Sequence, residues 1–314
     1  MLLDLAPIVL FVYNRPWHTE QTINALLKNK EASYSDLYIF ADGIKYNMSL
    51  EQKENFRKTR EYIHTISGFR NITIVESDQN KGLGKSIIDG VTSIIEKSET
   101  IIVLEDDIIV SPHFLRFMNE SLKRYYDAEK VICINAYNIN ENTKIKDTTY
   151  FLRGGDCQGW GTWRRAWKYF NPDAKELLDY MNAHMRLQRD YTFNGTMYYM
   201  DLLRAVVNKK NDSWAIRWYT STFIRGGLCL YPTKSLTQNI GFDIEATNTT
   251  TSDSNEVYTR VQATNEYIKY TFVPLKENKI ARKEYERIYR SLNYYPKVTY
   301  LQKIKCIIKK IFLQ

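Results

Sequence analysis

Short apolar runs alternate with helix-like segments through the first half of the chain, and this order restricts the fold more than any other feature. The runs that read as strands are Ile8–Tyr13, Leu37–Phe40, Asn71–Val75, Ile101–Leu104 and Val131–Ile134. The order predicts an α/β protein with a mostly parallel sheet and helices on both faces. After about residue 150 the alternation fades, so we expect an irregular second half.

Polar or charged residues follow four of these strands, at the point where each strand ends. They are Asn14-Arg15, Asp42, Asp78 and the triplet Glu105-Asp106-Asp107. The strand before the triplet is wholly apolar and is expected to be buried on both faces. Ligands of open parallel sheets bind at the carboxyl ends of the strands. The sequence therefore predicts a polar site along this edge.

The acidic triplet is the strongest candidate within that site. Three adjacent carboxylates repel one another, so a bound cation stabilises their ionised forms. Mg²⁺ and Mn²⁺ prefer oxygen ligands and are commonly held by one or two carboxylates together with substrate phosphates. We therefore expect Mn²⁺ or Mg²⁺ as the cofactor and a phosphorylated ligand. The alternative is a solvated acidic turn.

Two further features near the predicted edge have both a functional and a structural interpretation. The segment Lys81–Ser86 resembles the end of a phosphate-binding loop, although Gln79 stands where that motif requires glycine. Its glycines, Lys85 and the start of a helix favour an anion. Asp42 can bind a base or ribose, or it can form an Asx turn with the glycine that follows it.

The second half offers a candidate for proton transfer. Asp212 lies in Asn211-Asp212-Ser213-Trp214, apart from the acidic triplet. A carboxylate in that position can take the proton from an acceptor hydroxyl. The same spacing is typical of the start of a helix, where Asp212 would act as a cap.

Composition gives weaker indications about partners. The 24 Tyr, 13 Phe and 6 Trp either stack on sugar rings or fill the core, and composition alone favours the core. The net charge of +8 points to an anionic partner. The basic residues form no single RNA-binding motif, so we expect no nucleic acid. Leu301–Phe312 has the pattern of a basic amphipathic helix, which lies on an anionic bilayer or docks on the protein.

Cysteine spacing and hydropathy bear on localisation. Cys133, Cys157, Cys229 and Cys306 form no CxxC pair, which predicts free thiols in a reducing cytoplasm. The apolar start lacks the basic region and cleavage site of a signal peptide, and no run is long enough to cross a membrane. We expect a cytoplasmic protein with possible contact to the inner face of the cell membrane through its tail.

Taken together, the motifs resemble the nucleotide-sugar half of a GT-A glycosyltransferase. In the first half the resemblance rests on four segments: Asn14-Arg15-Pro16, Phe40–Gly43, Asn80–Ser86 and Val103–Asp107. In the second half it rests on three more: Gln158–Trp163, Asp212–Trp218 and Asn239–Asp243. The pattern is similar to bacterial family 2-like enzymes and to the N-acetylglucosaminyltransferase I type, whose metal motif is also EDD.

The resemblance implies a role for each matching residue. The nucleotide would be held by Tyr13, Asn14, Arg15 and Asp42, with Lys85 near the base or diphosphate. Asp107 would be the direct metal ligand, and Glu105 and Asp106 would contact the donor sugar or ribose. Asp212 would be the catalytic base. The acceptor and sugar pocket would be shaped by Gly159, Trp160 and Trp214. A histidine that often follows the Gly-Phe-Asp segment in related sequences is replaced here by Thr247-Asn248-Thr249.

The implied activity is inverting transfer of a sugar from a nucleotide-diphosphate sugar, first of all a UDP-sugar, to a saccharide acceptor. A lipid-linked acceptor in bacterial O-antigen or capsule synthesis would suit the basic tail. We expect residues 1–135 to bind the donor, 136–275 to bind the acceptor and carry catalysis, and 276–314 to form a basic helical tail. The alternatives are a nucleotide-sugar pyrophosphorylase or other nucleotidyltransferase, and a non-catalytic carbohydrate-binding protein.

Overall fold

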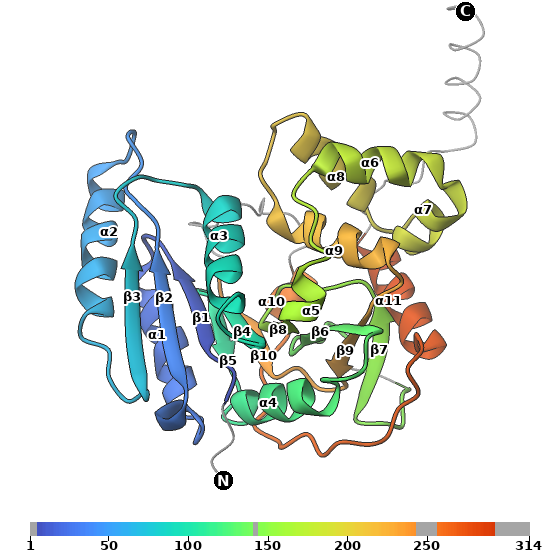
Figure 1. Ribbon diagram of the computed structural model, residues 1–314, viewed down its shortest axis with the longest axis horizontal. Coiled ribbons are helices and arrows are strands. Elements are labelled where there is room, and N and C mark those ends of the chain that lie inside the picture. The colour runs from blue at the N-terminus through green and yellow to red at the C-terminus, as the bar shows by residue number, and fades with distance from the viewer. Residues whose placement is uncertain (1–4, 141–143, 243–255, 293–314) are drawn as a thin grey trace, which may run out of the picture.

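The computed structural model describes residues 5–140, 144–242 and 256–292 (Figure 1). Its first part alternates strands and helices as the sequence predicts. In chain order the elements are β1 (Ile8–Val12), α1 (Pro16–Leu27), a short 3₁₀ helix (Ala32–Tyr34), β2 (Asp36–Ala41), α2 (Leu50–Ile63), β3 (Asn71–Glu76), α3 (Leu83–Ile95), β4 (Thr100–Glu105), β5 (Ile108–Val110), α4 (Phe114–Arg124) and β6 (Val131–Asn135). The helix α1 begins at Pro16, whose fixed φ and missing N–H suit the first turn.

The second part contains more regular structure than its sequence pattern indicates. Its elements are β7 (Thr149–Arg153), β8 (Trp160–Trp163), α5 (Arg164–Trp167), α6 (Ala174–Ala183), α7 (Met185–Tyr191), α8 (Tyr199–Val207), α9 (Trp214–Ile224), β9 (Leu228–Pro232), β10 (Thr237–Asn239), α10 (Glu256–Thr259) and α11 (Lys279–Ser291). Three of these strands join the same sheet as the first part, so the two halves share one core.

The central sheet is mostly parallel, as predicted, with the order β3-β2-β1-β4-β8-β6-β9-β7. The strands β1, β2, β3 and β4 pair in parallel, and β6 pairs in parallel with β9. The strands β8 and β7 run antiparallel to their neighbours. The chain moves from β1 outward to β3 and then crosses back to β4. Right-handed crossovers therefore put α1 and α2 on one face and α3 on the other.

The interior of the sheet is apolar. In β4 the residues Ile101 to Leu104 are at most 1% exposed, which confirms the prediction that this strand is buried on both faces. The glycine Gly90 of α3 lies where a Cβ would come within 2.7 Å of the ring of Phe11 in β1. This close approach seats α3 against the strands that carry the polar edge.

Most of the tryptophans lie in the core. Five of the six are buried, and the rings of four of them cluster around Trp160, whose centroid lies 5.3 Å from that of Trp214, 5.6 Å from that of Trp218 and 6.0 Å from that of Trp167. Trp17 is the exception at 56% exposed. For tryptophan, the structure thus favours the core interpretation over exposed platforms for sugars.

Two expectations about the chain as a whole can be compared with the described residues. Cys133, Cys157 and Cys229 are free thiols, as expected, while Cys306 lies outside the described residues. Among the described helices, none has the length and apolar character needed to span a membrane. The predicted basic helix Leu301–Phe312 also lies outside the described residues.

Candidate functional site

The acidic triplet lies where the order of the parallel strands reverses. The strand β1 has β2 on one side and β4 on the other, so the turns after β1 and β4 are neighbours. At this edge Arg15 Nη1 lies 2.9 Å from Asp107 Oδ2, and the N–H of Tyr13 donates to Asp106 Oδ2 at 3.4 Å. The hydroxyl of Thr22 in α1 donates to the Asp106 carbonyl at 2.8 Å. The fold thereby joins two predicted segments about 90 residues apart in sequence.

A third segment, which follows β10, also reaches the triplet. The strand β10 pairs antiparallel with β5, directly after the acidic turn. Beyond it the N–H of Ile240 donates to the Asp107 carbonyl at 2.9 Å, and Arg15 Nη2 donates to the Gly241 carbonyl at 3.3 Å. A Cβ on Gly241 would lie 1.9 Å from Asp107 Oδ2. Only glycine therefore fits against the Arg15–Asp107 pair in this arrangement.

The three carboxyl groups are strongly perturbed. Burial, followed by repulsion from Asp107 and Asp106, raises the pKa of Glu105. Burial and repulsion from Asp107 raise the pKa of Asp106. Burial also raises the pKa of Asp107, although the Arg15 guanidinium and His18 oppose this shift. The Arg15 guanidinium pairs with Asp107 beside two further carboxyl groups, so the site favours additional positive charge.

His18 is a site residue that sequence spacing does not reveal. It lies in the first turn of α1, is only 4% exposed and is close enough to influence the Asp107 carboxylate. Histidine–carboxylate contacts between segments this distant in sequence leave no local motif. Only the position of α1 beside the acidic turn reveals the contact.

Trp214 connects the second half to the triplet. It is the first residue of α9, and its indole N–H donates to the Glu105 carboxylate, which partly offsets the rise in the pKa of that group. Trp160 stacks behind it and is 1% exposed, so its ring has no open face for a sugar. Gly159 has φ +74° and is buried against Thr237, so it forms the turn into β8. In this structure Trp160 and Gly159 support the site from behind.

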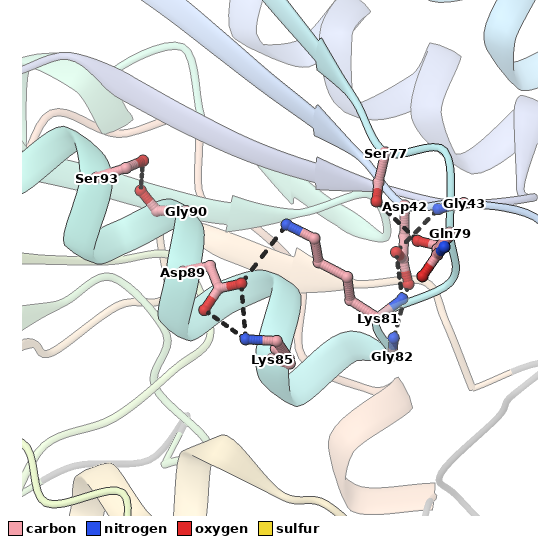
Figure 2. A network of polar contacts seen from close by, with 10 residues as sticks. All are labelled: Asp42, Gly43, Ser77, Gln79, Lys81, Gly82, Lys85, Asp89, Gly90 and Ser93. Carbon is pink, nitrogen blue, oxygen red and sulfur yellow. Dashed lines mark hydrogen bonds and ion pairs between the residues drawn. The ribbon is translucent and has the colours of Figure 1, made fainter.

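Asp42 organises the loop that begins α3, as Figure 2 shows. Its Oδ1 accepts hydrogen bonds from the N–H groups of Gly43 at 2.9 Å and Lys81 at 2.8 Å. Its Oδ2 accepts from the Gly82 N–H at 2.9 Å and from Asn80 Nδ2 at 3.0 Å. Four donors satisfy this buried carboxylate. In this structure Asp42 thus stabilises a loop, as the Asx-turn interpretation predicts, because both of its carboxylate oxygens accept hydrogen bonds from the protein.

The start of α3 also meets the proposed base. Gly84 lies where a Cβ would come within 2.3 Å of the Asp212 carbonyl oxygen and 2.5 Å of Asp212 Oδ2. The other oxygen, Oδ1, pairs with Arg217 Nη2 at 2.7 Å, while the Asp212 side chain remains 61% exposed. Ser213, rather than Asp212, caps α9 by accepting from the Ile216 N–H. Two carboxylates of the protein thus lie at the start of α3: Asp42 accepts hydrogen bonds from the loop before it, and Asp212 lies close to Gly84.

The structure does not bring Lys85 to the acidic triplet. Its side chain is 63% exposed, and its Nζ pairs with Asp89 at 3.1 Å, one turn further along α3 (Figure 2). Lys81 Nζ reaches the same carboxylate at 3.5 Å. Lys85 is thus paired within α3 in this structure, and its approach to a base or diphosphate stays a prediction.

The remaining predicted nucleotide residues lie at the end of β1. Tyr13 is half-buried, its Oη donates to Met48 Sδ at 3.3 Å, and it accepts from the Lys45 N–H at 3.3 Å. Asn14 is half-buried in the turn between β1 and α1. Asp243 and Thr247-Asn248-Thr249 lie outside the described residues.

The donor set suits a partially coordinated divalent cation. Within the described ranges, no group of three or more His, Cys, Asp or Glu side chains is arranged to hold a metal ion by itself. Mg²⁺ and Mn²⁺ bound with a diphosphate need only one or two protein carboxylates. The half-buried Glu105 and Asp107, with their raised pKa values and a single neighbouring arginine, meet that requirement.

Comparisons with known proteins leave the family open. No family model matches the chain, and neither does any curated protein. Among solved structures, it is similar to the mannosyltransferase PcManGT from Pyrobaculum calidifontis in complex with GDP-Man and Mn²⁺, with 11% identity and a TM-score of 0.32. That match covers 57% of this chain and 49% of the other.

Two other solved structures show similarly weak likeness. The match to S. aureus TarS has 9% identity and a TM-score of 0.37, and it covers 74% of this chain and 36% of that one. A UDP-glucose pyrophosphorylase complexed with UDP-glucose has 14% identity and a TM-score of 0.27, with 56% and 80% covered. The chain thus spans less than half the length of the two transferases. All three likenesses are too weak to carry an argument about function.

Proposed function

We propose that this protein is an inverting GT-A glycosyltransferase that moves a sugar from a nucleotide-diphosphate sugar, with a UDP-sugar as the first choice, to a saccharide acceptor. The observation that carries this proposal is the meeting of Arg15, the acidic triplet and Gly241 at the edge where the strand order reverses. Open α/β sheets bind nucleotides at such a point. Because the carboxylates of the triplet repel one another, a cation bound together with a diphosphate would stabilise their ionised forms.

The donor side is formed by the turns after β1 and β4. Asp107, with Glu105 beside it, would hold Mn²⁺ or Mg²⁺, which when bound neutralises charge on the departing diphosphate. Arg15 is buried and already positioned at Asp107, so it can contact a phosphate oxygen without a large rearrangement. Tyr13 and Asn14 border the space for the nucleoside. Asp42 contributes by fixing the loop between β3 and α3.

The acceptor side is assigned to the start of α9. Asp212 Oδ2 would take the proton of the acceptor hydroxyl while that oxygen bonds to the anomeric carbon. The bond from that carbon to the diphosphate oxygen breaks in the same displacement, and the diphosphate leaves with the electron pair. Arg217 holds the other carboxylate oxygen at 2.7 Å and so fixes the direction of Asp212. One displacement inverts the configuration at the anomeric carbon.

The proposed acceptor rests on the type of reaction and on the basic amphipathic sequence Leu301–Phe312. We place the reaction in the synthesis of a bacterial surface polysaccharide, O-antigen or capsule, with a lipid-linked saccharide as acceptor. The exposed Asp212 carboxylate is compatible with a large acceptor that approaches from solvent. The buried tryptophans argue against a protein that only binds carbohydrate through aromatic platforms.

The experiment is an assay of donor hydrolysis, in which water takes the place of the acceptor. Purified protein is incubated with UDP- and GDP-sugars, with Mn²⁺ or EDTA, and the release of nucleoside diphosphate is measured. We expect release that requires Mn²⁺ and falls about 100-fold or more in Asp107→Asn. The matched control is Asp78→Asn, a carboxylate that follows β3 on the same sheet edge, which should retain activity.

The same assay separates the proposal from its rivals. A pyrophosphorylase would release pyrophosphate from a nucleoside triphosphate and a sugar 1-phosphate, and a binding protein would release nothing. Asp212→Asn should keep nucleotide affinity and lose about 100- to 10,000-fold in hydrolysis, because only the proton transfer is removed. Metal-independent release, or full activity in Asp212→Asn, would contradict the mechanism.

A further inference from the structure

A stripe of basic side chains covers the exposed side of α11. Lys279, Lys283, Arg287 and Arg290 are all basic, and at about 100° per residue they fall within one narrow arc of the helix, on its solvent side. We name these four residues the basic face. The opposite side of α11 packs into the core through residues such as Tyr285, which is 3% exposed.

The acidic residues of α11 lie outside the arc of the basic face. Glu284 is buried, and its carboxylate accepts from Asn140 Nδ2. Glu286 lies beside the arc, where it accepts from Asn194 Nδ2 at 2.7 Å and pairs with Arg290 at 2.6 Å. Within the described part of α11, the exposed arc therefore carries positive charge and no carboxylate of its own.

Exposed apolar side chains lie in the first turn of α11 and in the segment that precedes it. Phe272 is 87% exposed, Leu275 is 44% exposed, and Ile280, which lies in the first turn of α11 beside the arc of the basic face, is 49% exposed. The segment 271–278 is held along the edge strand β7. There Thr148 N–H donates to Thr271 Oγ1 at 3.1 Å, and the Asn278 N–H donates to the Phe151 carbonyl at 2.8 Å. The apolar side chains are thus held on a fixed segment at the outer edge of the sheet (Figure 1).

We infer that the basic face, together with Phe272, Leu275 and Ile280, is a docking surface for an anionic lipid bilayer. Lysine and arginine are attracted to anionic headgroups, and neighbouring aromatic and aliphatic side chains enter the boundary between headgroups and acyl chains. A nucleic acid would use the basic residues but would gain little from Leu275 and Ile280. The inference goes beyond the proposed function, since bilayer binding requires neither donor nor acceptor.

The sequence beyond α11 has the same composition. In Leu301–Phe312, four lysines alternate with apolar residues at helical spacing. The placement of these residues is outside the described structure. Two consecutive segments with the same chemistry would strengthen attachment, because each additional basic residue near an anionic surface adds to the binding free energy.

The test is co-sedimentation of the full chain with vesicles of phosphatidylcholine, with and without phosphatidylglycerol. We expect binding only when phosphatidylglycerol is present, weakened by added salt because screening reduces the attraction. The triple variant Lys279→Glu/Lys283→Glu/Arg287→Glu should bind about tenfold or more weakly. The matched control Lys30→Glu/Lys53→Glu/Lys58→Glu reverses three exposed charges on and near α1 and α2, at the other end of the sheet, and should bind as the parent does.

A second variant tests whether apolar side chains contribute to vesicle binding. A second ligand, single-stranded DNA, tests whether the basic face binds nucleic acid instead. Phe272→Ser should weaken vesicle binding without changing its salt dependence, and thermal unfolding will show that each variant is folded. Equal binding to neutral vesicles, or equal loss in both triple variants, would overturn the inference. It would also be overturned if the α11 reversal abolished binding to single-stranded DNA and left vesicle binding intact, or if only removal of residues 293–314 affected vesicles.

Discussion

At the scale of single residues, Gly241 shows how closely the site is packed. A Cβ at this position would collide with Asp107 Oδ2 at 1.9 Å and approach Arg15 Nη1 to 2.9 Å. We predict that Gly241→Ala displaces the segment after β10 and abolishes stabilisation by Mn²⁺ with a nucleoside diphosphate. The measurement is the shift in thermal unfolding temperature on addition of both ligands.

The matched control is Gly226→Ala. Gly226 has φ +67°, and a Cβ added there would have no atom within 4 Å, so alanine costs about 1 kcal/mol of backbone strain without a collision. Both variants should be less stable than the parent, but only Gly241→Ala should lose the ligand response. If both responded to ligands alike, the Gly241 segment would be no part of the site.

Sequence reasoning finds the site residues that belong to local motifs and misses those that do not. Arg15 and the acidic triplet follow strands, so the rule for parallel sheets brings them together correctly. His18 and the backbone contacts of Gly241 depend on segments that meet only in three dimensions. For Lys85, the motif suggests an anion, yet the competing partner Asp89 lies one turn away in the same helix.

At the scale of elements, the start of α3 is where the two halves of the site meet. Asp42 binds the loop before α3, and Asp212 lies against its second residue, Gly84. The glycine leaves room for α9 to approach α3, and α9 carries Trp214 to Glu105. The position of the proposed base therefore depends on the first turn of α3.

We predict that Gly84→Ala pushes Asp212 away from α3. A Cβ only 2.3 Å from a backbone oxygen cannot be accommodated without movement, and overpacking of this kind costs about 1–3 kcal/mol. Unfolding in urea should show that loss, and donor hydrolysis should fall with it. The neighbouring Leu83→Ala, at a residue 41% exposed, should change both quantities little. If donor hydrolysis were unchanged in Gly84→Ala, the proposal that Asp212 is the catalytic base would be contradicted.

The elements themselves could be predicted in the first half and only partly in the second. Buried parallel strands such as β4 are continuous apolar runs, which the sequence displays directly. The strands β5 and β10 have three residues each, too few to show a period, and they form through pairing between distant segments. The strand β8 is Trp-Gly-Thr-Trp, and its place beside β4 depends on the tryptophan core.

At the scale of the whole molecule, the perturbed carboxyl groups of the acidic triplet make stability depend on pH. The pKa of Glu105 is raised from its ordinary value of 4.5 to about 8, so the folded state holds a proton that the unfolded chain releases. This contribution to stability is fully present below pH 4.5 and is lost as the pH rises through about 8. We predict that the metal-free protein becomes less stable across this interval.

Measurements of unfolding by urea at several pH values will test this, with Glu105→Gln as the reference. The glutamine variant cannot titrate, so it should lose less stability than the parent between about pH 5 and pH 8. Mn²⁺ competes with protons for the carboxylates, so its stabilising effect should be larger at about pH 8 than at about pH 6. Parallel stability profiles in the parent and Glu105→Gln would show that Glu105 is not perturbed.

The most direct test of the account is calorimetric titration of UDP and GDP into the protein, with Mn²⁺ or with EDTA. We predict that at least one diphosphate binds with Mn²⁺ and that its affinity falls by about tenfold or more in EDTA and in Asp107→Asn, but not in Asp78→Asn. Affinity that is equal with and without metal, or unchanged metal dependence in Asp107→Asn, would contradict the claim that the acidic triplet holds a cation and a diphosphate.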